Sequence, residues 1–151
     1  MDSKLKLYVG CSLTHAPQEF MDNIANFKEA LSSKFEILEF LGLKGTPREA
    51  YEKDIQECVA ECDLMLSFCD FPSLGLGYEL GTAIEKYSKP VLAVAHKDSF
   101  VSNLIIGIDH PMYNFDRYSD IIEVENMIQQ KAQKHFPKIQ VEVCETDICA
   151  V

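Results

Sequence analysis

One acidic residue in a glycine-rich stretch, Glu79, is the side chain of this sequence best placed to do chemistry. The stretch covers residues 69–81 (CDFPSLGLGYELG) and joins a short apolar segment to a helix predicted over 80–87. Gly75 and Gly77 lack a β-carbon, so the backbone can bend tightly there and a ligand can approach it closely. The pattern predicts a ligand-binding turn that carries a carboxylate.

Two common glycine motifs do not fit this stretch. The dinucleotide fingerprint requires a glycine three residues after Gly77, where this chain has Leu80, and the phosphate-binding loop of nucleoside triphosphatases requires a Gly-Lys-Ser/Thr ending that is absent. Neither NAD nor ATP is favoured, and no cofactor is expected. A structural alternative for Glu79 is an acid in the first turn of a helix, which the helix dipole favours by about 0.3–1 kcal/mol.

A carboxylate in such a turn could attack a sugar carbon. Cleavage of a glycosidic bond through a covalent sugar-enzyme intermediate needs one ionised carboxylate as the nucleophile and usually a second carboxyl group to protonate the leaving group. Asp54, in a predicted helix, is the candidate for the second group. Asp70 competes because it is closer to the turn, whereas Asp63 is expected to cap a turn at the far end of the sheet.

The elements that must position these groups alternate between apolar strands and amphipathic helices along the whole chain. Strands are predicted at 6–10, 35–40, 63–68, 91–95 and 112–115, and helices at 18–32, 47–62, 80–87, 101–106 and 120–134. In the tail, Ile139, Val141 and Val143 alternate like an edge strand. No linker or repeat divides the chain, so one domain over 1–151 is expected.

Repeated strand-helix units predict a parallel sheet covered by helices on both faces. With five strands, the expected fold is a flavodoxin-like three-layer α/β sandwich of strand order 2-1-3-4-5. Ligands of such sheets lie at the carboxyl ends of the strands where the order reverses, between strands one and three. Residues 8–12 and the glycine-rich stretch should therefore face each other there.

Composition limits the partners. The 151 residues carry a formal net charge of −10, which argues against a nucleic-acid polymer or an anionic membrane surface and favours a small molecule. No apolar run approaches the length of a membrane span and no signal sequence is recognised, so a cytoplasmic protein is expected.

The six cysteines do not form a metal pattern. No CxxC pair occurs, and the four histidines do not complete a zinc motif. Free, mostly buried thiols are expected, and no metal.

Three features resemble the nucleoside 2-deoxyribosyltransferases, and most closely their 2'-deoxynucleoside 5'-phosphate N-hydrolase branch. They are Tyr8 in a YxGxS pattern, Asp54 before the third strand, and the run PSLGLGYELG that contains Glu79. The resemblance extends from Tyr8 to about Gly107. It implies that Glu79 attacks the anomeric carbon, that Asp54 helps the base to depart, and that Tyr8 holds Glu79 in place.

The resemblance also implies a phosphate site. Ser73 stands where the transferases have an aspartate, as in the hydrolase branch; Ser102 matches a serine that reaches over from a neighbouring subunit, and Ser12 matches a third. Gly75 and Gly77 would contribute backbone to the substrate site. A homodimer or higher homo-oligomer is expected, with the tail from about 137 as a further subunit contact.

One position departs from the branch. Thr14 replaces an expected arginine, so the phosphate would lose its main cation. His15, Asn103 or the pair of residues 96–97 could compensate, and the sequence does not decide between them.

Four functions are therefore open. The first is cleavage of the N-glycosidic bond of (deoxy)nucleoside 5'-monophosphates to a free base and a sugar phosphate. The others are base exchange between deoxynucleosides, a non-catalytic nucleotide-binding module, and a flavodoxin-like domain with an unrelated ligand.

Aromatic residues at the ligand end could stack on a base. Phe71 and Phe100 are the candidates, because both are predicted in loops there. Tyr78 and Tyr113 could also stack, but aromatic residues at their spacing more often fill the core. Four phenylalanines are assigned to the core: Phe20, Phe27, Phe35 and Phe40.

Overall fold

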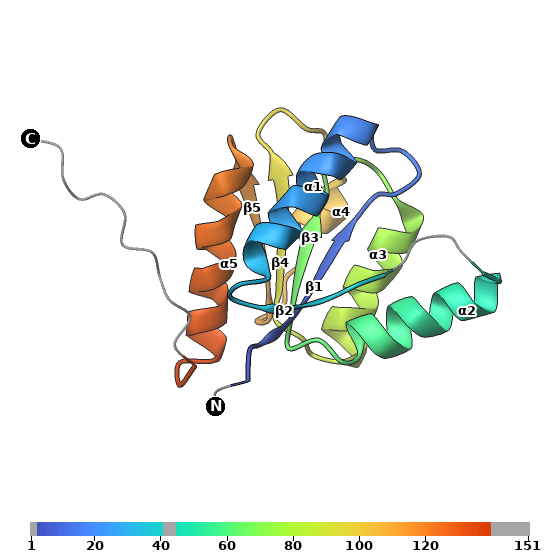
Figure 1. Cartoon of the computed structure of the whole chain (residues 1–151). Coiled ribbons are helices and arrows are strands. Elements are labelled where there is room, and N and C mark those ends of the chain that lie inside the picture. The colour runs from blue at the N-terminus through green and yellow to red at the C-terminus, as the bar shows by residue number, and fades with distance from the viewer. Residues whose placement is uncertain (1–2, 41–44, 140–151) are drawn as a thin grey trace, which may run out of the picture.

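The computed structural model describes residues 3–40 and 45–139. It contains a parallel sheet of five strands in the order β2-β1-β3-β4-β5 (Figure 1), which confirms the predicted flavodoxin-like topology. The strands are β1 (Lys6–Cys11), β2 (Glu36–Leu38), β3 (Leu64–Phe68), β4 (Val91–His96) and β5 (Tyr113–Tyr118).

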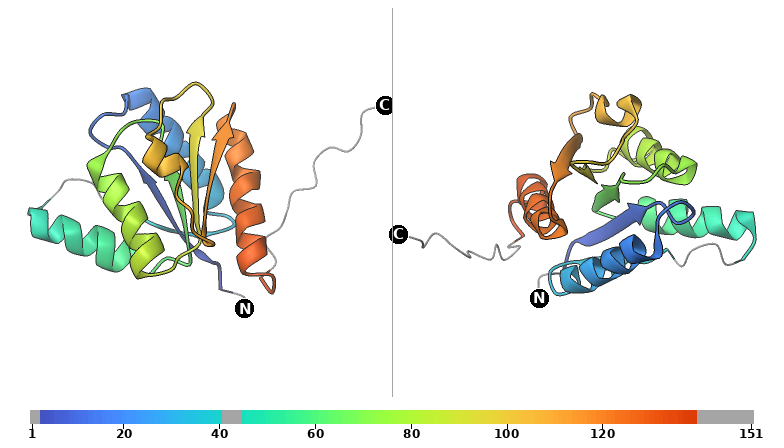
Figure 2. Two further views of the ribbon diagram at one scale, coloured as in Figure 1. Left: turned by 180° about the vertical axis from the view of Figure 1, so that it is seen from behind. Right: turned by 90° about the horizontal axis from the view of Figure 1, so that it is seen from above.

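Helices cover both faces of this sheet. They are α1 (Gln18–Leu31), α2 (Pro47–Tyr51) with its π-helical continuation η1 (Glu52–Val59), α3 (Leu74–Gly81) with its π-helical continuation η2 (Thr82–Lys86), α4 (Asn103–Ile106) and α5 (Ile121–His135). Seen from above, α1 and α5 lie on one face, and α2, α3 and α4 lie on the other (Figure 2).

The alternation of side chains along the strands determines which face each residue meets. In β1, Leu7 and Val9 pack into the core cluster shared with α1 and α5, whereas Tyr8 packs into the cluster shared with η1 and α3. Met65 of β3 joins Tyr8 on that second face. The period of two thus directs the strand-one tyrosine towards the helices that carry Asp54 and Glu79.

The predicted start of the third helix is wrong. α3 begins at Leu74, six residues before the predicted 80, so Gly75 and Gly77 are helical rather than part of a turn. Ser73 caps the helix, since its hydroxyl oxygen accepts a hydrogen bond from the N–H of Leu76 at 3.2 Å.

Packing explains why two glycines are tolerated there. Leu76 and Leu80 are buried at 4% and 1% exposure, and each such burial contributes about 1.5–3 kcal/mol, more than the roughly 1 kcal/mol that a helical glycine costs. Glu79 consequently lies beyond the first turn of α3, which removes the helix-dipole explanation of this acid.

Other boundaries differ less. The strand predicted at 35–40 is limited to Glu36–Leu38, the helix predicted at 47–62 ends at Val59, and the strand predicted at 112–115 extends to Tyr118. β5 is an edge strand, and Asp116 and Arg117 near its end are polar. The apolar pattern used for the prediction therefore stops before the strand does.

The tail prediction falls mainly outside the described residues. Ile139 packs against the α5 side of the core, but Val141 and Val143 are not described. Within the described ranges, Cys11, Cys58, Cys62 and Cys69 are free thiols, no helix is long and apolar enough to cross a membrane, and no group of His, Cys, Asp and Glu could hold a metal ion.

Candidate active site

A tyrosine and two carboxyl groups from three separate elements meet at the carboxyl end of the sheet. The hydroxyl oxygen of Tyr8, on β1, lies 2.7 Å from Oδ1 of Asp54 on η1 and 3.1 Å from Oε2 of Glu79 on α3. Tyr8 is buried and Glu79 is only 8% exposed. The fold therefore places the two carboxyl groups together around one phenol.

Burial changes the protonation of this group. Removal from water raises the pKa of Glu79 well above its usual range, and the charge of Asp54 and a hydrogen bond with it raise it further, while the hydrogen bond from Tyr8 lowers it. Burial and the two carboxylates also raise the pKa of Tyr8, so its hydroxyl stays protonated.

Two protons are needed to satisfy both contacts of the Tyr8 hydroxyl: its own and one on a carboxyl group. The Tyr8 hydroxyl has one proton to donate, so it can bond both carboxyl groups only if it donates to one and accepts from the other. Burial raises the pKa of Glu79, so Glu79 is the carboxyl group of the pair that favours the second proton. The arrangement holds one acid and one base side by side, as acid-base chemistry requires.

Gly10 makes this close packing possible. A β-carbon at Gly10 would lie 2.9 Å from Cδ1 of Leu76 and 3.0 Å from Oε2 of Glu79. By contrast, a β-carbon at Gly75 would meet only Oγ of Ser73 at 3.8 Å, and one at Gly77 would meet nothing within 4 Å. The glycine that this close packing requires is therefore Gly10 of the YxGxS pattern. The sequence prediction was based on Gly75 and Gly77 instead.

The carboxyl pair opens into a cavity of about 330 Å³. Its walls include Asp54 and Glu79 together with the aromatic rings of Phe40, Tyr51 and Tyr78. The rings of Tyr51 and Tyr78 lie 6.4 Å apart between centroids and are 38% and 56% exposed. Tyr51 was missed from the sequence, although it lies one helical turn before Asp54.

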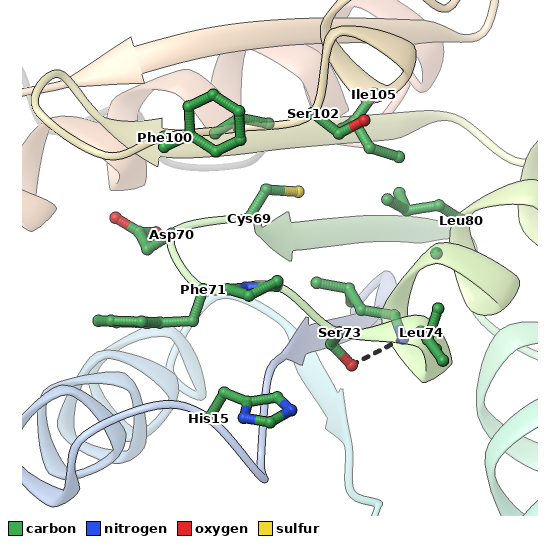
Figure 3. Close-up of a pocket in the computed structure, with 14 residues that line it drawn as sticks. His15, Cys69, Asp70, Phe71, Ser73, Leu74, Leu80, Phe100, Ser102 and Ile105 are labelled. Atoms are coloured by element: carbon green, nitrogen blue, oxygen red, sulfur yellow. Dashed lines mark hydrogen bonds between the residues drawn. The ribbon is translucent and has the colours of Figure 1, made fainter.

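A second cavity of about 540 Å³ lies on the other side of the α3 N-terminus. Ser73 lines both cavities. Figure 3 shows His15 and Ser73 on one side of the larger cavity and Phe100 and Ser102 on the other. Gly75 lines the smaller cavity and Gly77 the larger one. The two cavities thus meet at the cap of one helix.

The predicted phosphate-binding residues are not all at this surface. Ser12 is fully buried; its hydroxyl donates to the carbonyl of Pro72 at 3.2 Å and accepts from the N–H of His15 at 3.3 Å. It joins the loop after β1 to the glycine-rich stretch and lines neither cavity. Ser102 caps α4 by accepting from the N–H of Leu104, and Asn103 is exposed and lines neither cavity.

The competing acids have other contacts. Asp63 accepts a hydrogen bond from the backbone N–H of Lys6 at 2.8 Å, at the opposite end of the sheet, as expected. Asp70 accepts hydrogen bonds from residues of the β4 and β5 ends.

The two aromatic candidates differ. The ring of Phe71 packs edge-on against Phe20 at 5.0 Å between centroids, whereas Phe100 is 91% exposed. Phe27 and Phe35 are buried, and Phe20 and Phe40 are partly buried against the core.

The fold and this pair of carboxyl groups define a class: an α/β domain of flavodoxin-like topology with a buried acid-base site at the switch point of its sheet. The chain matches no family model. It is 36% identical over 80 residues to a protein of Thermofilum pendens named "Putative 2'-deoxynucleoside 5'-phosphate N-hydrolase 1". The match covers 52% of this chain and 54% of that protein, so the chain spans about half the length of this relative.

A solved structure shares the fold. The Clostridium botulinum CMP N-glycosidase BcmB superposes with a TM-score of 0.62 at 20% identity, covering 82% of this chain and 98% of that one. The Thermofilum match agrees with the resemblance to the N-hydrolase branch, and the solved structure supports the fold alone.

Proposed function

We propose that this protein cleaves the N-glycosidic bond of (deoxy)nucleoside 5'-monophosphates and releases a free base and a sugar phosphate. The observation that carries the proposal is the placement of Asp54 and Glu79 on either side of the Tyr8 hydroxyl. The names of the Thermofilum relative and of the structural neighbour, an N-hydrolase and an N-glycosidase, support it.

The first step forms a covalent sugar-enzyme intermediate. A carboxylate oxygen of Glu79 attacks C1' of the sugar while the bond between C1' and the base nitrogen breaks, and the base leaves with a proton from Asp54. In the second step a water oxygen attacks C1', the ester bond to Glu79 breaks, and Asp54 takes the proton of that water. The cycle returns both carboxyl groups to their starting states.

Tyr8 offers a path for the proton that must leave Glu79 before the first step. The nucleophile must be ionised, whereas burial raises the pKa of Glu79 and favours its protonated form. Because the hydroxyl of Tyr8 is within hydrogen-bond distance of both carboxyl groups, it can pass the proton from Glu79 to Asp54 when the substrate enters. Positive charge that develops on the sugar then favours the ionised form of Glu79.

The smaller cavity is the proposed place of the sugar and base. Glu79 and Asp54 form its reactive wall, and Phe40, Tyr51 and Tyr78 offer aromatic surface on which a base can stack. Tyr78 is the residue directly before the nucleophile, so a base held there would be close to the bond that breaks.

The larger cavity is the proposed place of the 5'-phosphate. Ser73 lies between the two cavities, and Ser102 and His15 face the larger one. Hydroxyl groups and backbone N–H groups at the start of α3 can hold a phosphate. Ser12 would act indirectly, by holding Pro72 beside Ser73.

A second copy of this chain is the proposed cover of the larger cavity. Leu74 and Phe100, which line the larger cavity, are 98% and 91% exposed, and exposed apolar patches usually mark an interface. In a two-fold dimer the same patch faces itself. Ser102 of the partner subunit would then approach the cavity, in agreement with the role implied by the resemblance.

One observation favours a second candidate. Among the described residues, no lysine or arginine lines either cavity, so a phosphate dianion would rely on hydroxyl groups and His15. Base exchange between unphosphorylated deoxynucleosides therefore remains the alternative activity.

A panel of purine and pyrimidine nucleosides, each with and without a 5'-phosphate, tests the proposal by release of free base. Glu79→Gln should lower kcat on the order of 10⁴-fold, because the amide cannot form the ester intermediate. Glu85→Gln, an exposed change in η2, is the matched control and should keep full activity.

Three other results of these assays would contradict the proposed function. Equal release of base by Glu79→Gln contradicts the mechanism. A new nucleoside formed when a different free base is added indicates base exchange. Nucleotide binding without any product after long incubation indicates a non-catalytic module.

A further inference from the structure

We propose that Asp70 and Arg117 are positioning residues that clamp the connection between β4 and α4 and thereby set the place of Ser102. The inference rests on the proposed function for its consequence, because Ser102 faces the cavity assigned to the 5'-phosphate. Arg117 lines neither cavity, whereas Asp70 is itself part of the wall of the larger one, and neither residue contacts the carboxyl pair.

The acidic half of the clamp is one oxygen of Asp70. Oδ1 accepts three hydrogen bonds: from the backbone N–H of His96 at 2.8 Å, from the hydroxyl of Tyr118 at 2.9 Å and from the hydroxyl of Ser99 at 3.2 Å. Asp70 is 8% exposed. One carboxylate at the end of β3 therefore holds the end of β4, the end of β5 and the turn that follows β4.

The basic half comes from β5. One guanidinium nitrogen of Arg117 donates to the carbonyl of His96 at 3.0 Å and to the carbonyl of Ser99 at 2.6 Å. Its guanidinium group also lies over the ring of Phe115, 5.1 Å from the centroid.

Asp70 and Arg117 both form hydrogen bonds with His96 and Ser99. Asp70 binds donor groups of His96 and Ser99, and Arg117 binds acceptor groups of the same pair. The turn is closed by the N–H of Ser99, which donates to the carbonyl of His96 at 3.0 Å. Hydrogen bonds to charged groups are the stronger ones, so these contacts stabilise this geometry of the turn.

Core packing does not account for this arrangement. Within the described segment 97–106, Val101 is the one buried residue, and Phe100 and Ser102 on either side of it face the cavity (Figure 3). Oδ2 of Asp70 is buried and has no hydrogen-bond partner among the described residues. An unpaired buried oxygen destabilises a fold, so the clamp is better explained by what the turn carries.

The expected consequence is a change in substrate binding rather than in chemistry. Ser102 lies three residues beyond the clamped Ser99, whereas Glu79 and Asp54 are held by Tyr8 without this segment. Loosening the turn should raise KM for the phosphorylated substrate and leave kcat nearly unchanged. The unphosphorylated nucleoside, which has no group for Ser102 to hold, should be unaffected.

Two variants test the clamp at different severity. Asp70→Asn weakens all three contacts of the carboxylate and also removes a negative charge from the wall of the larger cavity. Tyr118→Phe removes only the phenol donor and keeps that charge, so it separates positioning from a direct effect of charge on the phosphate. Ile128→Val, a fully buried change in α5, is the control for a general loss of stability. For each protein we would measure hydrogen exchange of segment 97–102, and kcat and KM for one nucleoside with and without its 5'-phosphate.

Asp70→Asn should speed exchange of segment 97–102 and raise KM for the nucleotide, each by about tenfold, with Tyr118→Phe showing a smaller change of the same kind. Exchange no faster than in Ile128→Val would overturn the clamp. Faster exchange with an unchanged KM would overturn its role for Ser102. If the wild-type protein releases no base, the proposed function fails, and the exchange measurement still decides the clamp.

Discussion

The two cavities that meet at Ser73 differ in how their polar groups are held. In the smaller cavity, Asp54 and Glu79 are fixed by the buried phenol of Tyr8 and by close packing over Gly10. In the larger cavity, the lining residues are mostly apolar, and two of them, Leu74 and Phe100, are almost fully exposed.

This difference agrees with the proposed dimer, in which one chain holds the proposed catalytic groups and a second copy covers the larger cavity. Tyr8, Asp54 and Glu79, the proposed reactive groups, meet within a single chain, because three of its elements bring them together. The surface proposed to hold the 5'-phosphate has hydroxyl groups but leaves large side chains in water, which a second copy would cover. Changes on the first side should therefore affect kcat, and changes on the second side should affect KM.

Gly10→Ala should have the largest effect of the changes that test this comparison. Its β-carbon would overlap Cδ1 of Leu76 and press on Oε2 of Glu79, and a displacement of about 1 Å in a catalytic group can cost 10²-fold in rate. We expect kcat to fall by about 10²-fold, measured by release of base.

Gly81→Ala is its matched control. A β-carbon at Gly81 would meet nothing within 4 Å, and alanine is favoured over glycine in a helix by up to about 1 kcal/mol. The control should keep its activity and unfold at a slightly higher temperature. If both variants lose activity equally, close packing over Gly10 is not what holds Glu79.

Tyr8→Phe should have an intermediate effect that depends on pH. The hydrogen bond from Tyr8 lowers the pKa of Glu79, so its removal raises that pKa further. Activity that requires ionised Glu79 then rises only at higher pH.

The size of that shift follows from the lost contact. A hydrogen bond to a charged group contributes about 1.5–3 kcal/mol, and one pKa unit corresponds to about 1.4 kcal/mol. The acid limb of the profile of kcat against pH should move up by about one pH unit or more. Tyr87→Phe, at the end of η2, should leave the limb in place, and a shift of the Tyr8→Phe limb to lower pH would contradict the arrangement.

The sequence was informative about the fold because the strands are buried. Continuous apolar runs such as residues 64–66 mark strands covered on both faces, and their alternation with helices leaves few topologies. This alternation predicted the strand order. It also predicted that β1 and the glycine-rich stretch face each other.

Local detail was less accessible, because tertiary contacts override local preference. Two glycines in four residues favour a turn, yet the burial of Leu76 and Leu80 draws Gly75 and Gly77 into α3. The demand for a glycine at position 10 depends on how closely α3 approaches β1, and no spacing in the sequence reports that distance. Ser12 matched a motif, but only the structure shows that its hydroxyl is directed to Pro72.

Phe100→Ser should have the smallest effect on catalysis and a clear effect on assembly. Phe100 is 91% exposed beside the larger cavity, and large aromatic side chains at an interface contribute a disproportionate share of its affinity. We expect the dissociation constant of the dimer, measured by light scattering over a dilution series, to rise about tenfold or more. KM for the nucleotide should rise a few-fold with it, while kcat at saturating substrate stays near that of the wild type, because the carboxyl pair belongs to one chain.

Ile122→Ser is the control for this prediction. It removes an apolar residue, 70% exposed, from α5 on the opposite face of the sheet, and it should leave both the dissociation constant and KM unchanged. A wild-type protein that is monomeric at every concentration, or a dimer that weakens equally in both variants, would show that the patch around Phe100 is not where copies of this chain meet.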